Sequence, residues 1–167
     1  MKEYKLSKLR NLLLMGASGA GKTTLAEQIF HLTHTTNRLG KIDEGNTVMD
    51  FDAEEIAKKT SLSLSLGWLN YKDHKINILD TPGTPDFIGD AIVAIPAVEN
   101  AVLVANAASG FEVGLELAIE HLENRKVGKV VVVNRMDNEH ADFHKTLESI
   151  HENAGFNPIP VHLPIGR

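Results

Sequence analysis

The chain of 167 residues is long enough to form one domain with its own hydrophobic core. It carries 17 Lys and Arg against 22 Asp and Glu, which disfavours a nucleic-acid-binding surface made by this segment alone, because phosphate binding needs clustered cations. The absence of cysteine excludes disulfides and cysteine-based zinc sites. The basic start of the chain leads into an apolar run at 12–15 that is too short for a secretory signal or a membrane span. We therefore expect a cytoplasmic protein with no membrane segment.

Short apolar runs alternate with amphipathic stretches along the chain. In chain order, the pattern predicts a strand at 12–15, a helix at 22–32, strands at 63–71 and 76–79, a helix at 86–98 that Pro96 weakens, a strand at 101–105, a helix at 114–125, a strand at 129–133, a helix at 142–154 and a last short strand at 159–163. On the helix at 22–32, the expected buried face is Leu25, Ile29 and Leu32. On the helix at 114–125, it is Leu115, Ala118, Ile119 and Leu122.

This order of elements predicts an α/β fold in three layers, with a mostly parallel sheet of about six strands. The strands at 63–71 and 76–79 follow each other closely, like a hairpin, so one edge strand should be antiparallel. The stretch 35–60 is polar and has no strong periodicity, and its length predicts a mobile functional loop.

A phosphate-binding loop is predicted between the first strand and the first helix. Residues 16–23 read Gly-Ala-Ser-Gly-Ala-Gly-Lys-Thr and match the pattern G-x-x-x-x-G-K-[ST], which is typical of the P-loop NTPase fold. The glycines let backbone N–H groups turn toward phosphate oxygens, Lys22 brings a positive charge to the β and γ phosphates, and Thr23 offers a hydroxyl to Mg²⁺. The alternative is a glycine-rich turn capped by Thr, which the strand–loop–helix context disfavours. The predicted nucleotide-binding residues here are Gly16, Ala17, Ser18, Gly19, Ala20, Gly21, Lys22, Thr23 and Thr24.

A second phosphate motif, Asp80-Thr-Pro-Gly83, follows the strand at 76–79. An Asp at the end of a strand beside a phosphate loop can hold Mg²⁺ through water, which is the role expected of Asp80. Gly83 has no side chain, so its backbone N–H can approach the γ-phosphate closely. By itself this sequence is a favourable turn, and its assignment therefore depends on the phosphate loop beside it.

A base-selecting motif, Asn134-Arg-Met-Asp137, follows the strand at 129–133. The carboxylate of Asp137 can accept both hydrogen bonds that guanine donates from N1 and N2, whereas adenine presents an acceptor there. Asn134 can donate to N7 and tie this loop to the phosphate loop, and the planar head of Arg135 can lie over the base. The motif predicts a preference for guanine and argues against an ATP-dependent kinase or ATPase.

Together with Val-Met-Asp-Phe-Asp-Ala-Glu-Glu at 48–55 and His-Leu-Pro-Ile-Gly at 162–166, these motifs resemble the GTPase domain of elongation factor G and its paralogues over nearly the whole chain. The resemblance implies a monomeric translational GTPase that binds GTP or GDP with Mg²⁺ and drives a translocation-like step on the ribosome. It implies catalytic roles for Lys22, Gly83 and Thr84. It implies that Thr23, Ser61 and Asp80 surround the metal.

Several residues depart from the family pattern. The family's magnesium-binding Thr is replaced by Ser61, with Thr60 beside it, and the family's water-orienting His is replaced by Thr84. Arg135 stands where the family has Lys, and Gly19 where it often has Asp. These departures leave open a second reading, in which the protein is a slow or non-hydrolysing GTP-dependent switch that acts on the ribosome.

The family also contacts guanine O6 with a loop after the last strand, and this chain shows no such loop. We therefore expect residues 1–167 to be a GTP-binding domain that is incomplete at its C-terminus, with further domains beyond residue 167.

Overall fold

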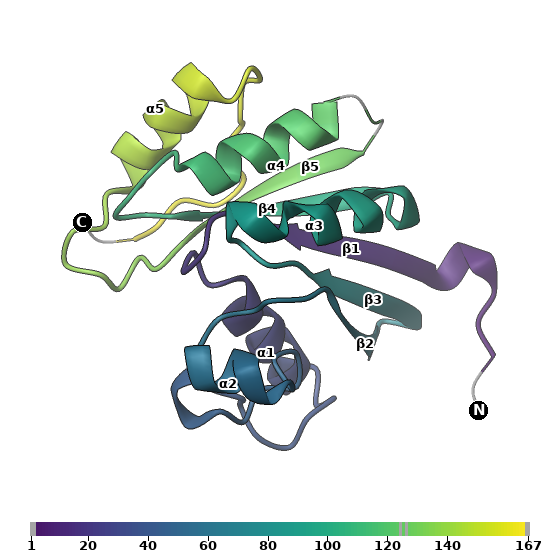
Figure 1. Ribbon diagram of the computed structural model, residues 1–167. Coiled ribbons are helices and arrows are strands. Elements are labelled where there is room, and N and C mark those ends of the chain that lie inside the picture. Colours follow the sequence, from purple (N-terminus) through teal and green to yellow (C-terminus); the bar gives the residue numbers. More distant parts are fainter. Residues whose placement is uncertain (1–2, 124, 126, 166–167) are drawn as a thin grey trace.

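The computed structural model describes residues 3–123, 125 and 127–165, which form a sheet flanked by helices (Figure 1). The sheet has five strands in the order β2-β3-β1-β4-β5. β1 pairs in parallel with β3 and β4, β4 pairs in parallel with β5, and β2 pairs antiparallel with β3 at the edge. The predicted, mostly parallel sheet with one antiparallel edge strand is therefore confirmed. The strands are β1 (Leu9–Met15), β2 (Ser65–Tyr71), β3 (His74–Asp80), β4 (Asn100–Asn106) and β5 (Gly128–Asn134).

Helices cover both faces of the sheet, which confirms the predicted three layers. On one face, Ala26 and Phe30 of α1 pack with Leu14 of β1 and Ile78 of β3. On the other face, α3, α4 and α5 bury apolar side chains against alternate residues of the same strands, and Figure 1 shows α3 and α4 there. The helices are α1 (Lys22–Leu32), α2 (Ala53–Lys58), α3 (Ile88–Ala94), α4 (Val113–Glu123) and α5 (Phe143–Asn153), with short 3-10 turns at Leu6–Lys8, Ile42–Glu44, Pro85–Phe87 and Ile95–Ala97.

The sixth strand predicted at 159–163 is not formed, so that prediction was wrong. Ile159 and Val161 are 82% and 85% exposed, and within the described residues β5 pairs with β4 alone. The alternation of apolar residues imitates a strand, but Pro158 and Pro160 have no N–H to donate to a neighbouring strand. The described sheet therefore ends at β5.

The helix faces were predicted with mixed success. Leu115, Ala118, Ile119 and Leu122 of α4 are all buried, as expected. The prediction for α1 was right only in part: Ile29 packs against the core, but Leu32 is 73% exposed and the buried residues that meet the sheet are Ala26 and Phe30. Phe30 buries the largest apolar surface on this helix, and the small Ala26 one turn earlier allows a close approach. The predicted helix at 86–98 is interrupted as expected, with Pro96 inside the final 3-10 turn.

The stretch 35–60, predicted as a mobile loop, contains the 3-10 turn Ile42–Glu44 and the helix α2. α2 begins with a capping box, in which the side chain of Asp52 accepts from the N–H of Glu54 at 2.8 Å and that of Glu55 accepts from the N–H of Asp52 at 3.3 Å. The short helix has too few apolar residues to give the periodicity on which the prediction relied. None of the described helices combines the length and apolar character needed to cross a membrane.

Candidate nucleotide-binding site

The phosphate loop joins the buried end of β1 to the start of α1. Gly16, Gly19 and Gly21 have φ angles of 142°, 75° and 96°, in a region that side chains disfavour, so glycine is required by the backbone. A Cβ atom at Gly16 would also collide with the carbonyl oxygen of Val104 in β4. The sequence therefore folds here as the motif predicts, into a tight loop that ends at a helix N-terminus.

Lys22 lies over this loop and is almost fully buried. Its ammonium donates to the carbonyl oxygens of Gly16 at 3.0 Å and Ala17 at 2.9 Å. Burial lowers the pKa of Lys22 because it removes water from the charge, whereas the nearby carboxylates of Asp80 and Asp50 act in the opposite direction. The loop thus holds a cation where phosphate oxygens are expected to bind.

A chain of oxygen atoms lies beside Lys22. The hydroxyl of Thr23 donates to Oδ2 of Asp80 at 2.6 Å and lies 3.1 Å from the hydroxyl of Ser61. The Ser61 hydroxyl donates in turn to Oδ1 of Asp50 at 2.7 Å. The structure therefore brings together Thr23, Ser61 and Asp80, as predicted, and favours Ser61 over the adjacent Thr60 as the residue that reaches them.

Asp50 is a member of this group that the sequence analysis did not select. It lies in the stretch 48–55, which was quoted only for its resemblance to a family. A single acidic residue in a polar loop has no pattern that distinguishes it from a solvated one. Its burial and its bond to Ser61, 11 positions away, arise only in the folded conformation of the loop.

These oxygen atoms fit a hard cation such as Mg²⁺. Oδ1 of Asp80 and Oδ2 of Asp50 are buried and have no hydrogen-bond partner among the described residues. Burial raises the pKa of Asp80 to about 7 and also raises the pKa of Asp50, and the nearby charge of Lys22 offsets only part of this effect. The described residues contain no cluster of three or more His, Cys, Asp or Glu suited to a metal. Mg²⁺ suits such a sparse site because it keeps several waters and binds substrate phosphates.

Gly83 lies directly against the phosphate loop. A Cβ atom at this position would lie 2.5 Å from the backbone nitrogen of Ser18 and 2.6 Å from the carbonyl carbon of Ala17, and would collide with the ammonium of Lys22. Only glycine allows this approach. Thr84 follows at the N-cap position of the 3-10 turn Pro85–Phe87, but no capping bond from its side chain is found in the described structure. A role for the Thr84 side chain in capping this turn is therefore not supported.

The base-selecting motif begins where β5 ends. The side-chain amide of Asn134 donates to the carbonyl oxygen of Ala20 at 2.9 Å, which is the predicted tie between the two loops. Arg135 adopts a left-handed backbone conformation with φ of 59° and is exposed beside Gly21. Asp137 is exposed on the following turn. The structure thus brings Asn134 and Arg135 to the phosphate loop, and Asp137 follows on the exposed turn.

A cavity of about 680 Å³ joins these parts, a size that suits a nucleotide. Residues 39–43 and 58–61 form the wall opposite the phosphate loop. Asp80 and Asn134 are not among the described residues that line it, and neither is Asp137. The predicted site residues that line it are Ser18, Gly19, Gly21, Lys22, Thr23, Thr24, Ser61, Gly83 and Arg135.

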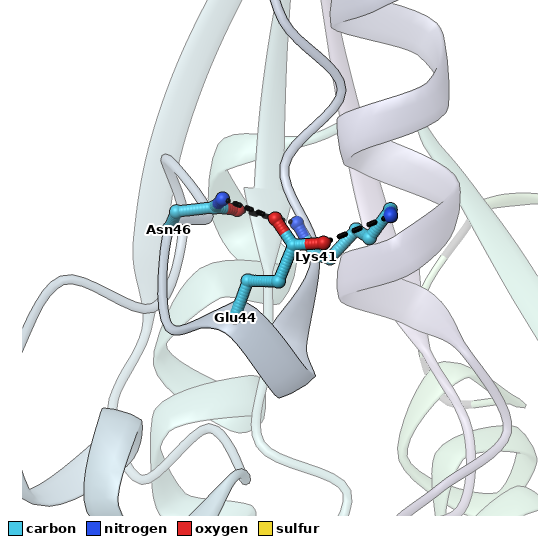
Figure 2. A network of polar contacts seen from close by, with 3 residues as sticks. All are labelled: Lys41, Glu44 and Asn46. Carbon is cyan, nitrogen blue, oxygen red and sulfur yellow. Dashed lines mark hydrogen bonds and ion pairs between the residues drawn. The ribbon is translucent and has the colours of Figure 1, made fainter.

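Part of the far wall is shaped by a small polar network. Figure 2 shows Glu44 between Lys41 and Asn46, with the ammonium of Lys41 donating at 2.8 Å and the amide of Asn46 at 2.9 Å. The backbone N–H of Lys41 also donates to Oδ1 of Asn46 at 2.7 Å, which closes the turn. The hydrogen bond from Lys41 holds the pKa of the Glu44 carboxyl below its usual range. Lys41 and Glu44 are exposed and Asn46 is half-buried, so this network shapes the turn more than it stabilises the fold.

Comparison with known proteins agrees with this geometry. Residues 7–161 match the family described as the elongation factor Tu GTP-binding domain. A crystal structure of a protein from Thermus thermophilus is 31% identical and superposes with a TM-score of 0.84. The match covers 89% of this chain and 22% of that protein, so the chain spans about a fifth of the length of its structural relative. The family match includes the phosphate loop, the turn at 80–83 and the motif at 134–137.

Proposed function

The chain belongs to the family of elongation factor Tu GTP-binding domains, and on that premise we propose that it hydrolyses GTP with Mg²⁺ to drive a translocation-like step on the ribosome. Membership makes it a GTP-binding domain of the translation-factor type. The observation that carries the proposal further is the convergence of Lys22, Thr23 and Gly83 on one cavity, with Asp80 bonded to Thr23 behind it.

Lys22 and the turned backbone of the phosphate loop would bind the β and γ phosphates, since both bring positive charge to the same end of the cavity. Gly83 would bring its backbone N–H to the γ-phosphate, because its missing side chain already lets the backbone reach Ser18. Thr23, Ser61, Asp80 and Asp50 would hold Mg²⁺. The bound metal supplies charge neutralisation to the phosphate oxygens.

Guanine selection would depend on residues at the end of β5. Asn134 is held by its bond to Ala20, so its position relative to the phosphate loop is fixed before a nucleotide binds. Asp137 would accept from N1 and N2 of the base, and Arg135 would cover its face. The exposure of Asp137 is compatible with this role, because the base would supply the missing partner.

The second candidate function is a slow GTP-dependent switch that acts by occupying the ribosome. Thr84 favours it, because its short side chain carries no ring nitrogen to orient a water molecule. The side chain also forms no capping bond in the described structure. Binding would then survive while hydrolysis is slow, because Lys22 and the phosphate loop are complete.

Two measurements test the proposal in order. Calorimetry with GTP, GDP and ATP, with and without Mg²⁺, should show Mg²⁺-dependent binding of the guanine nucleotides and about ten- to a hundred-fold weaker binding of ATP, the discrimination given by a charged bidentate contact. Single-turnover hydrolysis with and without ribosomes then separates the two candidates. Equal affinity for ATP would contradict the base assignment, and a rate that ribosomes do not change would contradict the translational role.

A further inference from the structure

A buried carboxylate lies one turn along α1 from Thr23. Glu27 is fully buried, and its Oε1 accepts from the backbone N–H groups of Val48 at 2.7 Å and Met49 at 3.2 Å. Its Oε2 has no hydrogen-bond partner among the residues that the structure describes. Burying a carboxylate is costly compared with burying an apolar side chain of similar size. Packing alone therefore does not explain a Glu at this position.

The backbone at 48–49, to which Glu27 is bonded, leads into the group of oxygen atoms around Thr23. Met49 is buried in the core beside Phe30, and its carbonyl oxygen accepts from the hydroxyl of Ser65 at 2.7 Å. The next residue is Asp50, whose carboxylate accepts from Ser61. Ser61 lies 3.1 Å from Thr23, so the path returns to α1 four residues before Glu27.

Gly40 leaves room for the Glu27 carboxylate, and Glu55 holds the residues that follow Ser61. A Cβ atom at Gly40 would collide with the Glu27 carboxylate, so the missing side chain makes space for it. A second buried carboxylate, Glu55, accepts from the N–H groups of Leu62 at 2.9 Å and Ser63 at 3.1 Å. Ser61 is thus held between a segment fixed by Glu55 and an acceptor placed by Glu27.

We propose that Glu27 is a positioning residue for the metal side of the nucleotide site: it holds the backbone at 48–49 against α1 and thereby places Asp50 and Ser61 beside Thr23. The inference rests on the proposed function, because the side chains it places are those expected to serve Mg²⁺. Glu27 itself contacts neither metal nor nucleotide.

The test compares two variants of Glu27 with a matched control. Glu27→Met keeps the volume and removes both acceptor atoms, whereas Glu27→Gln keeps one oxygen acceptor for Val48 and Met49. Thr146→Val is the control, because Thr146 is also buried and donates to a backbone oxygen, that of Ala107 at 3.1 Å, from α5. Amide hydrogen exchange at 48–49 is measured without nucleotide. The affinity for the imido analogue of GTP is measured by calorimetry at graded Mg²⁺ concentrations.

We expect Glu27→Met to speed amide exchange at 48–49. We also expect it to raise by about ten-fold the Mg²⁺ concentration that gives half of the maximal gain in nucleotide affinity, because hydrogen bonds to a charged acceptor are lost. Glu27→Gln should recover most of both effects, and Thr146→Val should show neither. If Glu27 acts through Ser61, adding Ser61→Ala to Glu27→Met should raise the Mg²⁺ requirement little beyond that of the worse single variant.

Three results would overturn the inference: unchanged exchange in Glu27→Met, faster exchange with a native Mg²⁺ requirement, or fully additive effects with Ser61→Ala. A native protein that binds no guanine nucleotide would instead overturn the proposed function. Because exchange is measured without nucleotide, the two failures are distinguishable.

Discussion

Asp80 is expected to lower the stability of the metal-free protein, although it is one of the residues proposed to hold Mg²⁺. It is buried at the end of β3, its Oδ2 accepts from Thr23, and its Oδ1 has no partner within the described residues. Burial raises its pKa from the ordinary 3.8 to about 7, with the bond from Thr23 acting in the opposite direction. Asp80→Asn removes the charge and keeps both the shape and an acceptor for Thr23.

The sign of the pH dependence follows from proton binding. Between about pH 4 and pH 7 the folded protein holds a proton on Asp80 that the unfolded chain has released, so stability falls as the pH rises through this window. At about 1.4 kcal/mol per pH unit, the rise from 3.8 to about 7 corresponds to about 4 kcal/mol, of which about 2 kcal/mol falls between pH 5.5 and pH 8. Water entering the site would reduce both values.

The assay is urea unfolding in the presence of a chelator at pH 5.5 and pH 8. Asp80→Asn should be more stable than the native protein at pH 8 and should lose about 2 kcal/mol of the native pH dependence. Asp142→Asn is the control, because the backbone N–H of Lys145 lowers the pKa of that exposed carboxylate and its removal should bring no gain. The reasoning is refuted if Asp80→Asn is no more stable at pH 8 or keeps the full pH dependence.

Three further variants test the nucleotide site. Asp137→Asn should weaken GDP binding about ten- to a hundred-fold and improve binding of xanthosine diphosphate, and an unchanged GDP affinity in calorimetry would remove Asp137 from the base site. Thr84→His should raise hydrolysis on ribosomes by about 10²–10⁴ at similar GTP affinity, unless the native protein is already fast, in which case another residue orients the water. Asn134→Ala, which loses the bond to Ala20, should weaken GTP and GDP alike by about 0.5–1.5 kcal/mol in calorimetry, and unchanged affinities would show that this bond does not support the nucleotide site.

The sequence predicted the parts of the fold that local rules govern. The glycines of the phosphate loop have the positive φ angles that their spacing implies, and the inward face of α4 follows directly from its periodicity. Local rules also explain the errors. The apolar residues at 159–163 satisfied the alternation of a strand, while Pro158 and Pro160 removed donors that a strand requires. The face of α1 was predicted only in part, because the predicted face included Leu32 and left out Phe30.

The metal side of the site was beyond local rules. Ser61 was selected through a family resemblance, and its neighbour Thr60 remained an equal candidate until the structure placed the Ser61 hydroxyl near Thr23. Asp50 and Glu27 carry no motif, because their roles depend on hydrogen bonds that form only in the fold: Glu27 accepts from Val48, 21 positions away, and Asp50 accepts from Ser61, 11 positions away. Such contacts depend on the register between distant segments, which periodicity does not encode.

The distribution of buried charge explains why the loop that contains Asp50 and Ser61 is held by several contacts. Glu27, Asp50 and Asp80 are all buried on the α1 side of the sheet, and burial raises the pKa of each. The opposite face has an extended core of apolar side chains from α3, α4 and α5. The α1 side therefore contributes less to the stability of the nucleotide-free fold, and Met49 and Glu55 fix the loop where the charges repel. A cation bound beside Asp50 and Asp80 would reduce that repulsion, so ligand binding and order in the loop should be coupled.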